Sequence, residues 1–289
     1  MTEPRRLDAA ALAEHPLPPV QDGDKDSKGR ILILAGSRDV PGAALLAASA
    51  AMRAGAGKLR IATVESIARH VGIAMPEAMV IGLAEDSDGG FARESVAVIR
   101  EQAAHVDCVV AGPGMAQGDV CKRISDALLE TAPALALDAA LLHELSPLEP
   151  RELERAKLPL LLPHAGELAS LLNREEEEVE AEPIRCGHRA AQLYRSVVLV
   201  KGVVSHVVHP DGRAWSYDGG APGLGVSGSG DTLAGIVGGL LARGAEPLNA
   251  LLWAVWLHGE AGASLSRKVG PVGFLAREIP GEIPALLPR

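Results

Sequence analysis

An aspartate closes a glycine-rich stretch in the last third of the chain. This stretch, called here the glycine-rich loop, runs from Pro222 to Asp231, and residues 232–243 after it have an apolar helical pattern. Glycines allow backbone N–H groups to approach a ligand closely. The first turn of a helix leaves its N–H groups without intrahelical partners, and the helix dipole favours negative charge there. The loop therefore predicts an anion-binding site at a helix N-terminus.

Asp231 gives this site a second property, because a carboxylate in a phosphate cradle repels the ligand. A site that only binds phosphate has no use for it, whereas a base that takes a proton from an attacking hydroxyl must lie there. The pattern thus favours phosphoryl transfer. The structural alternative, a helix cap with a first-turn carboxylate favoured by the dipole, stays open from these residues alone.

Two known glycine-rich phosphate-binding motifs do not fit the loop. The letters Gly223-x-Gly225-x-x-Gly228 match the dinucleotide fingerprint, but that fingerprint follows a strand, and residues 218–222 indicate a loop. A Walker loop ends in Gly-Lys-Ser/Thr, which the chain lacks. We interpret the dinucleotide match as chance.

Other polar residues and glycines follow short apolar runs that predict strands at 30–34, 58–63, 108–111, 134–137, 158–162 and 197–200. The residues in question are Ser37, Gly112, Gly114, Asp138, His164, Glu167 and Lys201. Residues 42–55 form an Ala-rich helical segment after the first strand, which favours a βαβ unit and a parallel sheet. All these residues are then expected at one edge of the sheet, where α/β proteins bind ligands. Purely structural roles stay open for three of them. In these roles Ser37 caps a turn, His164 begins a helix and bonds to backbone, and Lys201 is a surface lysine on a turn.

Bulk composition excludes several classes of function. The chain has 289 residues, is 47% hydrophobic and carries a net charge of −9, which argues against nucleic-acid partners. Three scattered cysteines suggest neither a disulfide framework nor a zinc site and fit a reducing cytoplasm. No signal peptide is visible, and the longest apolar run, 250–257, is too short for a membrane span.

The chain is expected to comprise an N-terminal tail or arm over residues 1–28 and a single doubly wound α/β domain over 29–289, without a separate lid domain. A long apolar helix is predicted over 248–265. Its Trp253 and Trp256 are interpreted as core or subunit-interface residues, and His258 as a core histidine with its hydrogen bonds satisfied.

From residue 29 onward the chain resembles the ribokinase-like superfamily and, within it, the NAD(P)H-hydrate dehydratases that lack an epimerase domain. The resemblance depends on the order and spacing of short motifs, each weak alone. They are Ala35-Gly36-Ser37 with Pro41-Gly42-Ala43, Met75-Pro76-Glu77, Gly112-Pro113-Gly114, Leu137-Asp138-Ala139, Pro163-His164-Ala165-Gly166-Glu167, Lys201-Gly202, Gly228-Ser229-Gly230-Asp231 and His258-Gly259-Glu260-Ala261-Gly262.

This resemblance implies a three-layer α/β/α fold and the repair of hydrated NADH or NADPH. ADP or ATP, with Mg²⁺, phosphorylates the hydroxyl of the hydrate, and loss of phosphate restores the dihydropyridine ring. By family position Asp231 is the base, and Gly228, Ser229 and Gly230 supply N–H groups to the phosphoryl group. The hydrate would be bound by Ala43, Gly114, His164 and Asp231, and the adenine nucleotide by Lys201, Gly202, Val203, Val204, Ser205 and Gly230. No protein metal-ligand set is implied. Family members are often homo-oligomers, tetramers included.

Four positions depart from the usual family pattern: Ala140, Leu162, Ala165 and Ala263. Ala140 stands where the family often has a second aspartate, which leaves a different hydroxylated substrate open. Two rival functions are therefore kept. One is a small-molecule kinase of the same superfamily, of the hydroxyethylthiazole or pyridoxal type, and the other is a nucleotide-binding regulatory protein without turnover.

Overall fold

A computed structural model describes residues 3–19, 25, 27–147 and 158–288 of the chain. Within these residues ten strands form one sheet in the order β1-β10-β9-β8-β7-β6-β5-β2-β3-β4. All neighbouring strands are parallel except β9, which is antiparallel to both β8 and β10. The strands are β1 (Arg5–Arg6), β2 (Arg30–Leu34), β3 (Lys58–Val64), β4 (Ala78–Leu83), β5 (Cys108–Ala111), β6 (Leu135–Leu137), β7 (Leu160–Leu161), β8 (Val197–Val200), β9 (Ser205–Val208) and β10 (Ala214–Tyr217).

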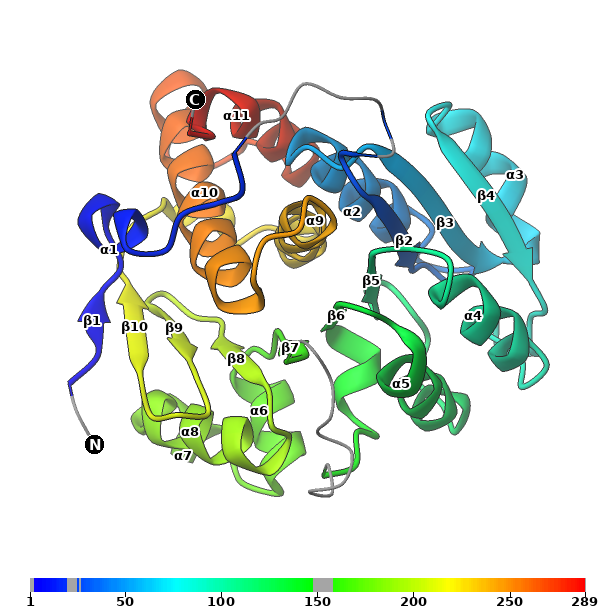
Figure 1. Cartoon of the computed structure of the whole chain (residues 1–289), viewed down its shortest axis with the longest axis horizontal. Helices are drawn as coiled ribbons and strands as arrows, with labels where there is room; N and C mark the ends of the chain where they lie inside the picture. The colour runs from blue at the N-terminus through cyan, green and yellow to red at the C-terminus, as the bar shows by residue number, and fades with distance from the viewer. Residues whose placement is uncertain (1–2, 20–24, 26, 148–157, 289) are drawn as a thin grey trace.

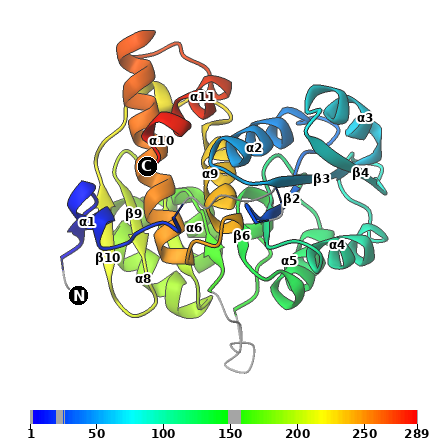
Figure 2. The same ribbon diagram turned by 45° about the horizontal axis from the view of Figure 1, so that its top comes forward.

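Helices cover both faces of the sheet, as Figures 1 and 2 show. One layer contains α2 (Gly42–Arg53), α3 (Glu65–Ala74), α9 (Ser229–Ala242), α10 (Pro247–Lys268) and α11 (Ile279–Leu286). The other contains α4 (Ser95–Ala103), α5 (Val120–Thr131), α6 (Ala165–Leu172), α7 (Glu176–Ala181) and α8 (Pro183–Leu193). Three 3₁₀ turns, η1 (Ala139–Leu142), η3 (Pro222–Leu224) and η4 (Ala276–Glu278), and the short helix α1 (Ala9–Ala13) complete the described elements. The expected doubly wound α/β fold with a mostly parallel sheet is confirmed.

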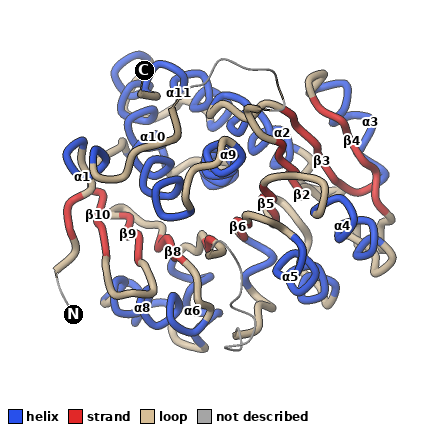
Figure 3. Tube along the Cα trace, viewed as in Figure 1, coloured by secondary structure: helices blue, strands red, loops and turns tan. Residues whose placement is uncertain are grey.

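Burial explains why the central strands are short apolar runs. Strands β5 and β8 are buried at every position, because helices cover them on both sides. Figure 3 shows the strands crossing the molecule as one twisted band between the helical layers. The sheet brings the carboxyl ends of β2, β5, β6, β7 and β8 to one edge, since these strands are all parallel.

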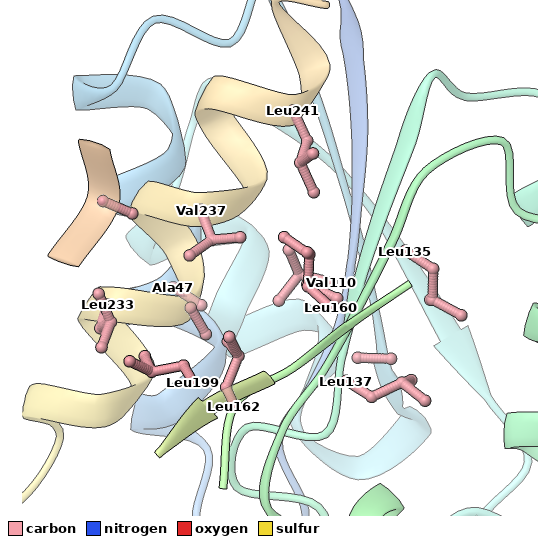
Figure 4. Close-up of a cluster of buried hydrophobic side chains, with 14 of the residues drawn as sticks. Ala47, Val110, Leu135, Leu137, Leu160, Leu162, Leu199, Leu233, Val237 and Leu241 are labelled. Carbon is pink, nitrogen blue, oxygen red and sulfur yellow. The ribbon is translucent and has the colours of Figure 1, made fainter. Parts of the chain in front are cut away.

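Helix α9 lies against the middle of the sheet, between α2 and α10 (Figure 1). Its apolar side chains meet those of the central strands in the cluster drawn in Figure 4, where Leu233, Val237 and Leu241 face residues such as Val110 and Leu160. Against α2 the approach is closer. A Cβ added at Gly235 would lie 2.2 Å from the carbonyl oxygen of Ala47, so only glycine permits this contact between the two helices.

The N-terminal segment packs on its own chain. Strand β1 adds to the sheet beside β10, and the indole Nε1 of Trp253 on α10 donates to the carbonyl oxygen of His15 at 2.8 Å. The imidazole of His15 meets the ring of Trp215 edge-on, with centroids 5.3 Å apart. Strand β1 was not predicted from the sequence, and no element was predicted for the residues of α3, α7 and α8.

Most predicted strands and helices agree with the observed bounds to within one or two residues, but two differ in ways that affect the site. The strand predicted at 158–162 is β7, with only Leu160–Leu161 in the ladder. Helix α9 begins at Ser229, not Thr232, so Asp231 belongs to its first turn. Among the described residues, none of the helices combines the length and the apolar composition needed to cross a bilayer.

Candidate active site

The N-terminus of α9 is exposed to the strand-end edge by an abrupt turn at Gly228. Gly228 has φ +88°, which strains any other residue, and a Cβ there would lie 2.4 Å from Leu46 Cδ1 on α2, so that leucine side chain would have to shift. The first intrahelical bond runs from Thr232 N to Gly228 O. The N–H groups of Gly230 and Asp231 precede that bond and are the groups a helix leaves for a ligand.

Ser229 differs from its neighbours in this turn. Its N–H donates to the carbonyl oxygen of Val226 at 3.1 Å, and so it is already used within the loop. Its hydroxyl oxygen lies 3.0 Å from Nε2 of His258 on α10. Ser229 was expected to supply a main-chain N–H to the phosphoryl group, but that N–H is bonded within the loop, and the hydroxyl is the donor that remains.

The carboxyl group of Asp231 has a raised pKa of about 6. Burial is the main cause, and repulsion from the nearby Asp138 carboxylate adds to it, while the Lys201 ammonium acts in the opposite direction. A carboxylate with a pKa near 6 is ionised at neutral pH and is a stronger base than an exposed aspartate. These properties are those required of a general base.

Lys201 lies at the end of β8 with a side chain only 19% exposed. Its Nζ donates to Asp138 Oδ1 at 2.8 Å and lies 3.6 Å from Glu167 Oε2. Burial alone would lower the pKa of this amine, but the two carboxylates outweigh it and raise the pKa, so Lys201 is a cation. A Cβ on Gly230 would lie 3.9 Å from Nζ, which places the cation beside the turn that begins α9.

His164 is the N-cap of α6, and its Nδ1 accepts from the N–H groups of Gly166 at 3.1 Å and Glu167 at 3.4 Å. Glu167 completes the capping box by accepting from the His164 N–H at 2.9 Å. Nδ1 of His164 therefore has the purely structural role expected of a histidine that begins a helix. Its Nε2 lies 3.4 Å from Glu167 Oε1, and the side chain is still 57% exposed, so part of the ring is open to a ligand.

Ala43 and Gly114 lie side by side on the other flank of the site. Gly114, with φ +62°, follows β5, and a Cβ on it would come within 2.4 Å of the Ala43 Cβ at the start of α2. One turn further along α2, Leu46 contacts Gly228. Ala43 and Gly114, two of the four residues expected to bind the hydrate, are thus connected through α2 to the turn that carries Asp231.

Five of the six residues expected to bind the nucleotide, all except Gly230, form the connection between β8 and β9. Lys201 begins it, Gly202 follows, and Ser205 begins β9 with its hydroxyl 3.4 Å from the Gly202 carbonyl oxygen. Val203 is 98% exposed and Val204 is also exposed, so this connection offers apolar surface next to the cation. Such a surface suits a flat apolar ring, as adenine presents.

Two residues of the site were singled out by sequence without a role of their own. Asp138 and Glu167 both follow strands, and the strand-end rule places them at this edge, but their shared contact with Lys201 could not be deduced from spacing. Of the four departures from the family pattern, Ala140 and Leu162 are buried, and Ala165 and Ala263 are partly buried.

A cavity of about 600 Å³ lies elsewhere, between α7, α8 and the turn joining β9 to β10. That turn is next to the start of β8, so the cavity belongs to the opposite edge of the sheet. Three of its four arginines are paired with carboxylates that also line the cavity, in the pairs Arg174–Glu178, Arg185–Glu182 and Arg213–Asp211. It has no contact with the residues described above.

Comparisons with known proteins agree with the geometry. A family model described as NAD(P)H-hydrate dehydratase matches residues 31–285. The chain is 46% identical to the ADP-dependent (S)-NAD(P)H-hydrate dehydratase of Xanthomonas campestris pv. campestris, covering 100% of this chain and 99% of that protein. It spans about half the length of bifunctional NAD(P)H-hydrate repair enzymes that it also matches.

Solved structures extend the likeness to three dimensions. The ADP/ATP-dependent NAD(P)H-hydrate dehydratase of Bacillus subtilis, co-crystallised with ATP and Mg²⁺, superposes with a TM-score of 0.85 at 27% identity, over 99% of this chain and 98% of that one. A ribokinase-like superfamily protein from Enterococcus faecalis gives 0.80 over 98% and 94% at 24% identity, which shows the fold. With the glycine-rich turn, its aspartate and the strand-end residues in place, the chain belongs to the NAD(P)H-hydrate dehydratase family.

Proposed function

We propose that this chain is an ADP- or ATP-dependent NAD(P)H-hydrate dehydratase in which Asp231 is the general base. The observation that carries the proposal is the position of this carboxylate, in the first turn of α9, with a pKa raised to about 6. It lies where free helix N–H groups attract phosphate, and that position benefits a protein that must deprotonate a hydroxyl, not one that only binds an anion.

The proposed reaction has two stages, phosphoryl transfer to the hydrate followed by loss of phosphate. Asp231 accepts the hydroxyl proton of the hydrate, the oxygen attacks the terminal phosphorus of the nucleotide, and the bond to the leaving nucleotide breaks. Phosphate is a better leaving group than hydroxide, so the original C–O bond of the hydrate, whose oxygen now carries the phosphoryl group, can then cleave. Loss of phosphate together with a ring proton restores the double bond of the dihydropyridine. The N–H groups of Gly230 and Asp231 and the Lys201 cation would stabilise negative charge on the transferring group.

The carboxylates at the site fit a magnesium ion that arrives with the nucleotide. Mg²⁺ is generally bound through phosphates and one or two carboxylates, without a complete protein cage. Among the described residues no cluster of three or more His, Cys, Asp or Glu side chains could hold a metal. Asp138 and Asp231 repel one another, and a cation between them and the phosphates would relieve that repulsion. When bound, Mg²⁺ would neutralise phosphate charge.

The test uses purified protein and hydrated NADH, supplied with ADP and with ATP in separate reactions. Formation of NADH and free phosphate is the expected result, followed by NADH absorbance and a phosphate assay. A stable phosphoester product would instead indicate a small-molecule kinase, and nucleotide binding without any product would indicate a regulatory protein. Asp231→Asn should keep nucleotide affinity while turnover falls by a factor on the order of 10³.

A further inference from the structure

The motif His258 to Gly262 on α10 packs against the glycine-rich loop from behind. A Cβ on Gly262 would lie 2.5 Å from Leu224 in the loop, and one on Gly259 would lie 2.2 Å from the ring of Tyr217, which precedes the loop. The Tyr217 hydroxyl donates to Glu260 Oε1 at 3.0 Å. These residues match the family motif, but neither the base nor the nucleotide contacts proposed above involve them.

His258 is the member of the motif that reaches the phosphate turn itself. Its Nε2 lies 3.0 Å from Ser229 Oγ and 3.1 Å from the Ser229 carbonyl oxygen. Both of these oxygen atoms belong to Ser229, which lies two residues before Asp231 in the sequence. The sequence interpretation of His258 as a histidine with satisfied hydrogen bonds is correct, but the bonds connect it to the first turn of α9.

The proton position on His258 follows from these two contacts. Burial lowers its pKa to about 4, so the ring is neutral at pH 7 and carries one N–H. A carbonyl oxygen can only accept, so the 3.1 Å contact is a hydrogen bond only when Nε2 carries the hydrogen. With the other tautomer, two lone pairs would face each other. The contacts therefore assign the Nε2–H tautomer.

This tautomer determines what the Ser229 hydroxyl can do. Because the one Nε2–H is shared between the carbonyl oxygen and the hydroxyl oxygen of Ser229, the hydroxyl cannot donate to Nε2 and its own hydrogen stays free. If Ser229 instead donated to an unprotonated Nε2, only lone pairs would face a phosphoryl oxygen and would repel it. The main-chain N–H of Ser229 is already bonded to Val226, so the hydroxyl is the donor this residue has left.

We propose that His258 is a positioning residue: its Nε2–H holds Ser229 so that the serine hydroxyl donates to the transferring phosphoryl group. The inference goes beyond the proposed function and rests on it, since it requires the phosphoryl group to bind at the start of α9. It predicts that His258 acts on catalysis only through Ser229. A residue that merely fills space between α9 and α10 would not show that dependence.

The experiment measures kcat and KM for ADP with hydrated NADH and Mg²⁺, together with thermal unfolding. His258→Leu, which removes the donor at similar volume, should lower kcat about tenfold to a hundredfold with a smaller change in KM. His258→Gln places an amide N–H near the position of Nε2 and should recover most of that loss. Should His258→Leu fail to fold, His258→Asn, whose amide is too short to reach Ser229, takes its place in the comparison.

A double-mutant cycle decides between positioning and packing. Ser229→Ala should lower kcat by a factor like that of His258→Leu, and the double variant should be no slower than Ser229→Ala alone, within about twofold. Losses that multiply would overturn the inference, and so would near-normal kcat in His258→Leu. His188→Leu is the matched control, since His188 is a buried helix histidine next to the cavity at the opposite edge; its kcat should match the wild type.

Wild type and Asp231→Asn are assayed in the same series so that the two proposals fail separately. An inactive wild type or an active Asp231→Asn contradicts the proposed function. An active wild type and an inactive Asp231→Asn, combined with a fully active His258→Leu, contradict only the role given to His258.

Discussion

Asp231 is held in a balance between groups that oppose its charge and one that favours it. Burial and the Asp138 carboxylate raise its pKa, and the Lys201 cation limits the rise, so that the value is about 6. Lys201 in turn is fixed by Asp138 and Glu167. The base strength of the site therefore depends on three side chains from three different strand ends, none of which is near Asp231 in the sequence.

This balance predicts the pH dependence of the reaction. Asp231 must be ionised to accept a proton, so kcat/KM should rise about tenfold per pH unit below 6 and level off above about 7. Asp138→Asn removes one source of repulsion and should move this limb to lower pH. The measurement is a pH profile of kcat/KM over the range in which the protein stays folded by circular dichroism. A limb that stays near 6 in that variant would show that burial alone sets the pKa.

The Asp231 carboxylate should also lower the free energy of unfolding at neutral pH. Its pKa is higher in the folded chain, about 6, than in the unfolded chain, so the folded state loses stability as the pH rises from about 4 to about 6 and stays weakened at neutral pH. We expect Asp231→Asn to be more stable than the wild type at pH 7–8, on the order of 2 kcal/mol, with the difference vanishing towards pH 4. Urea unfolding at pH 4.5 and 7.5 measures this; equal stabilities at pH 7.5 would contradict it.

Asp231, Lys201 and His164 could be predicted as site residues because their positions obey general rules, namely a carboxylate in an anion loop and polar residues after strands. It could not identify that Lys201 bonds to Asp138 or that His258 bonds to Ser229. Those contacts depend on side chains from distant segments meeting at one point, and no local spacing encodes such a meeting.

At the scale of elements, the site depends on how closely α9 approaches α2. Gly235 and Gly239 let the α9 backbone contact the carbonyl oxygens of Ala47 and Ala51, and a Cβ at these glycines would lie 2.2 and 2.4 Å from those oxygens. The Ala-rich composition of α2 serves the same contact, since its buried alanines leave room for a second backbone. The N-terminus of α9 is thereby placed against Leu46 and the start of α2.

Gly235→Ala tests whether this contact positions the phosphate turn. The added methyl group collides with backbone, so α9 must move, and we expect a loss of about 1–3 kcal/mol in stability. Turnover should fall as well, because the N–H groups at the start of α9 move with the helix. Gly281→Ala in α11, where nothing lies within 4 Å, is the matched control and should keep both properties. Gly235→Ala with normal turnover would argue against the coupling.

The elements that sequence predicted well are those with a single dominant signal. Strands such as β5 and β8 are uniformly apolar because both faces are covered, and α2 is marked by its alanines. The start of α9 was placed three residues too late, because the glycines and Ser229 look like a loop while tertiary contacts hold them in the first turn. Strand β1 has only Arg5 and Arg6 in the ladder, too few for any periodic pattern.

At the scale of the whole molecule, the candidate site and the N-terminal segment lie in different parts of the fold. The site occupies the carboxyl edge of the central strands, whereas β1 and α1 lie at the far end of the sheet beside β10 and α10 (Figure 1). His15 contacts α10 at Trp253 and Asn249, in its N-terminal half, while His258 lies further along the same helix. The segment thus supports the helix that carries the proposed positioning residue without touching the site.

Removal of residues 1–15 should therefore affect stability more than chemistry. The truncation deletes the contacts of His15 with Trp215, Trp253 and Asn249 and uncovers β10, so we expect unfolding several degrees lower in temperature. At 25 °C, kcat and KM should stay within about twofold, because the start of α9 keeps its other neighbours. Trp253→Phe, which loses only the bond to the His15 carbonyl oxygen, should show a smaller effect of the same kind. A truncated protein that stays folded but loses turnover would mean that the segment acts on the site through α10, and the separation argued here would be wrong.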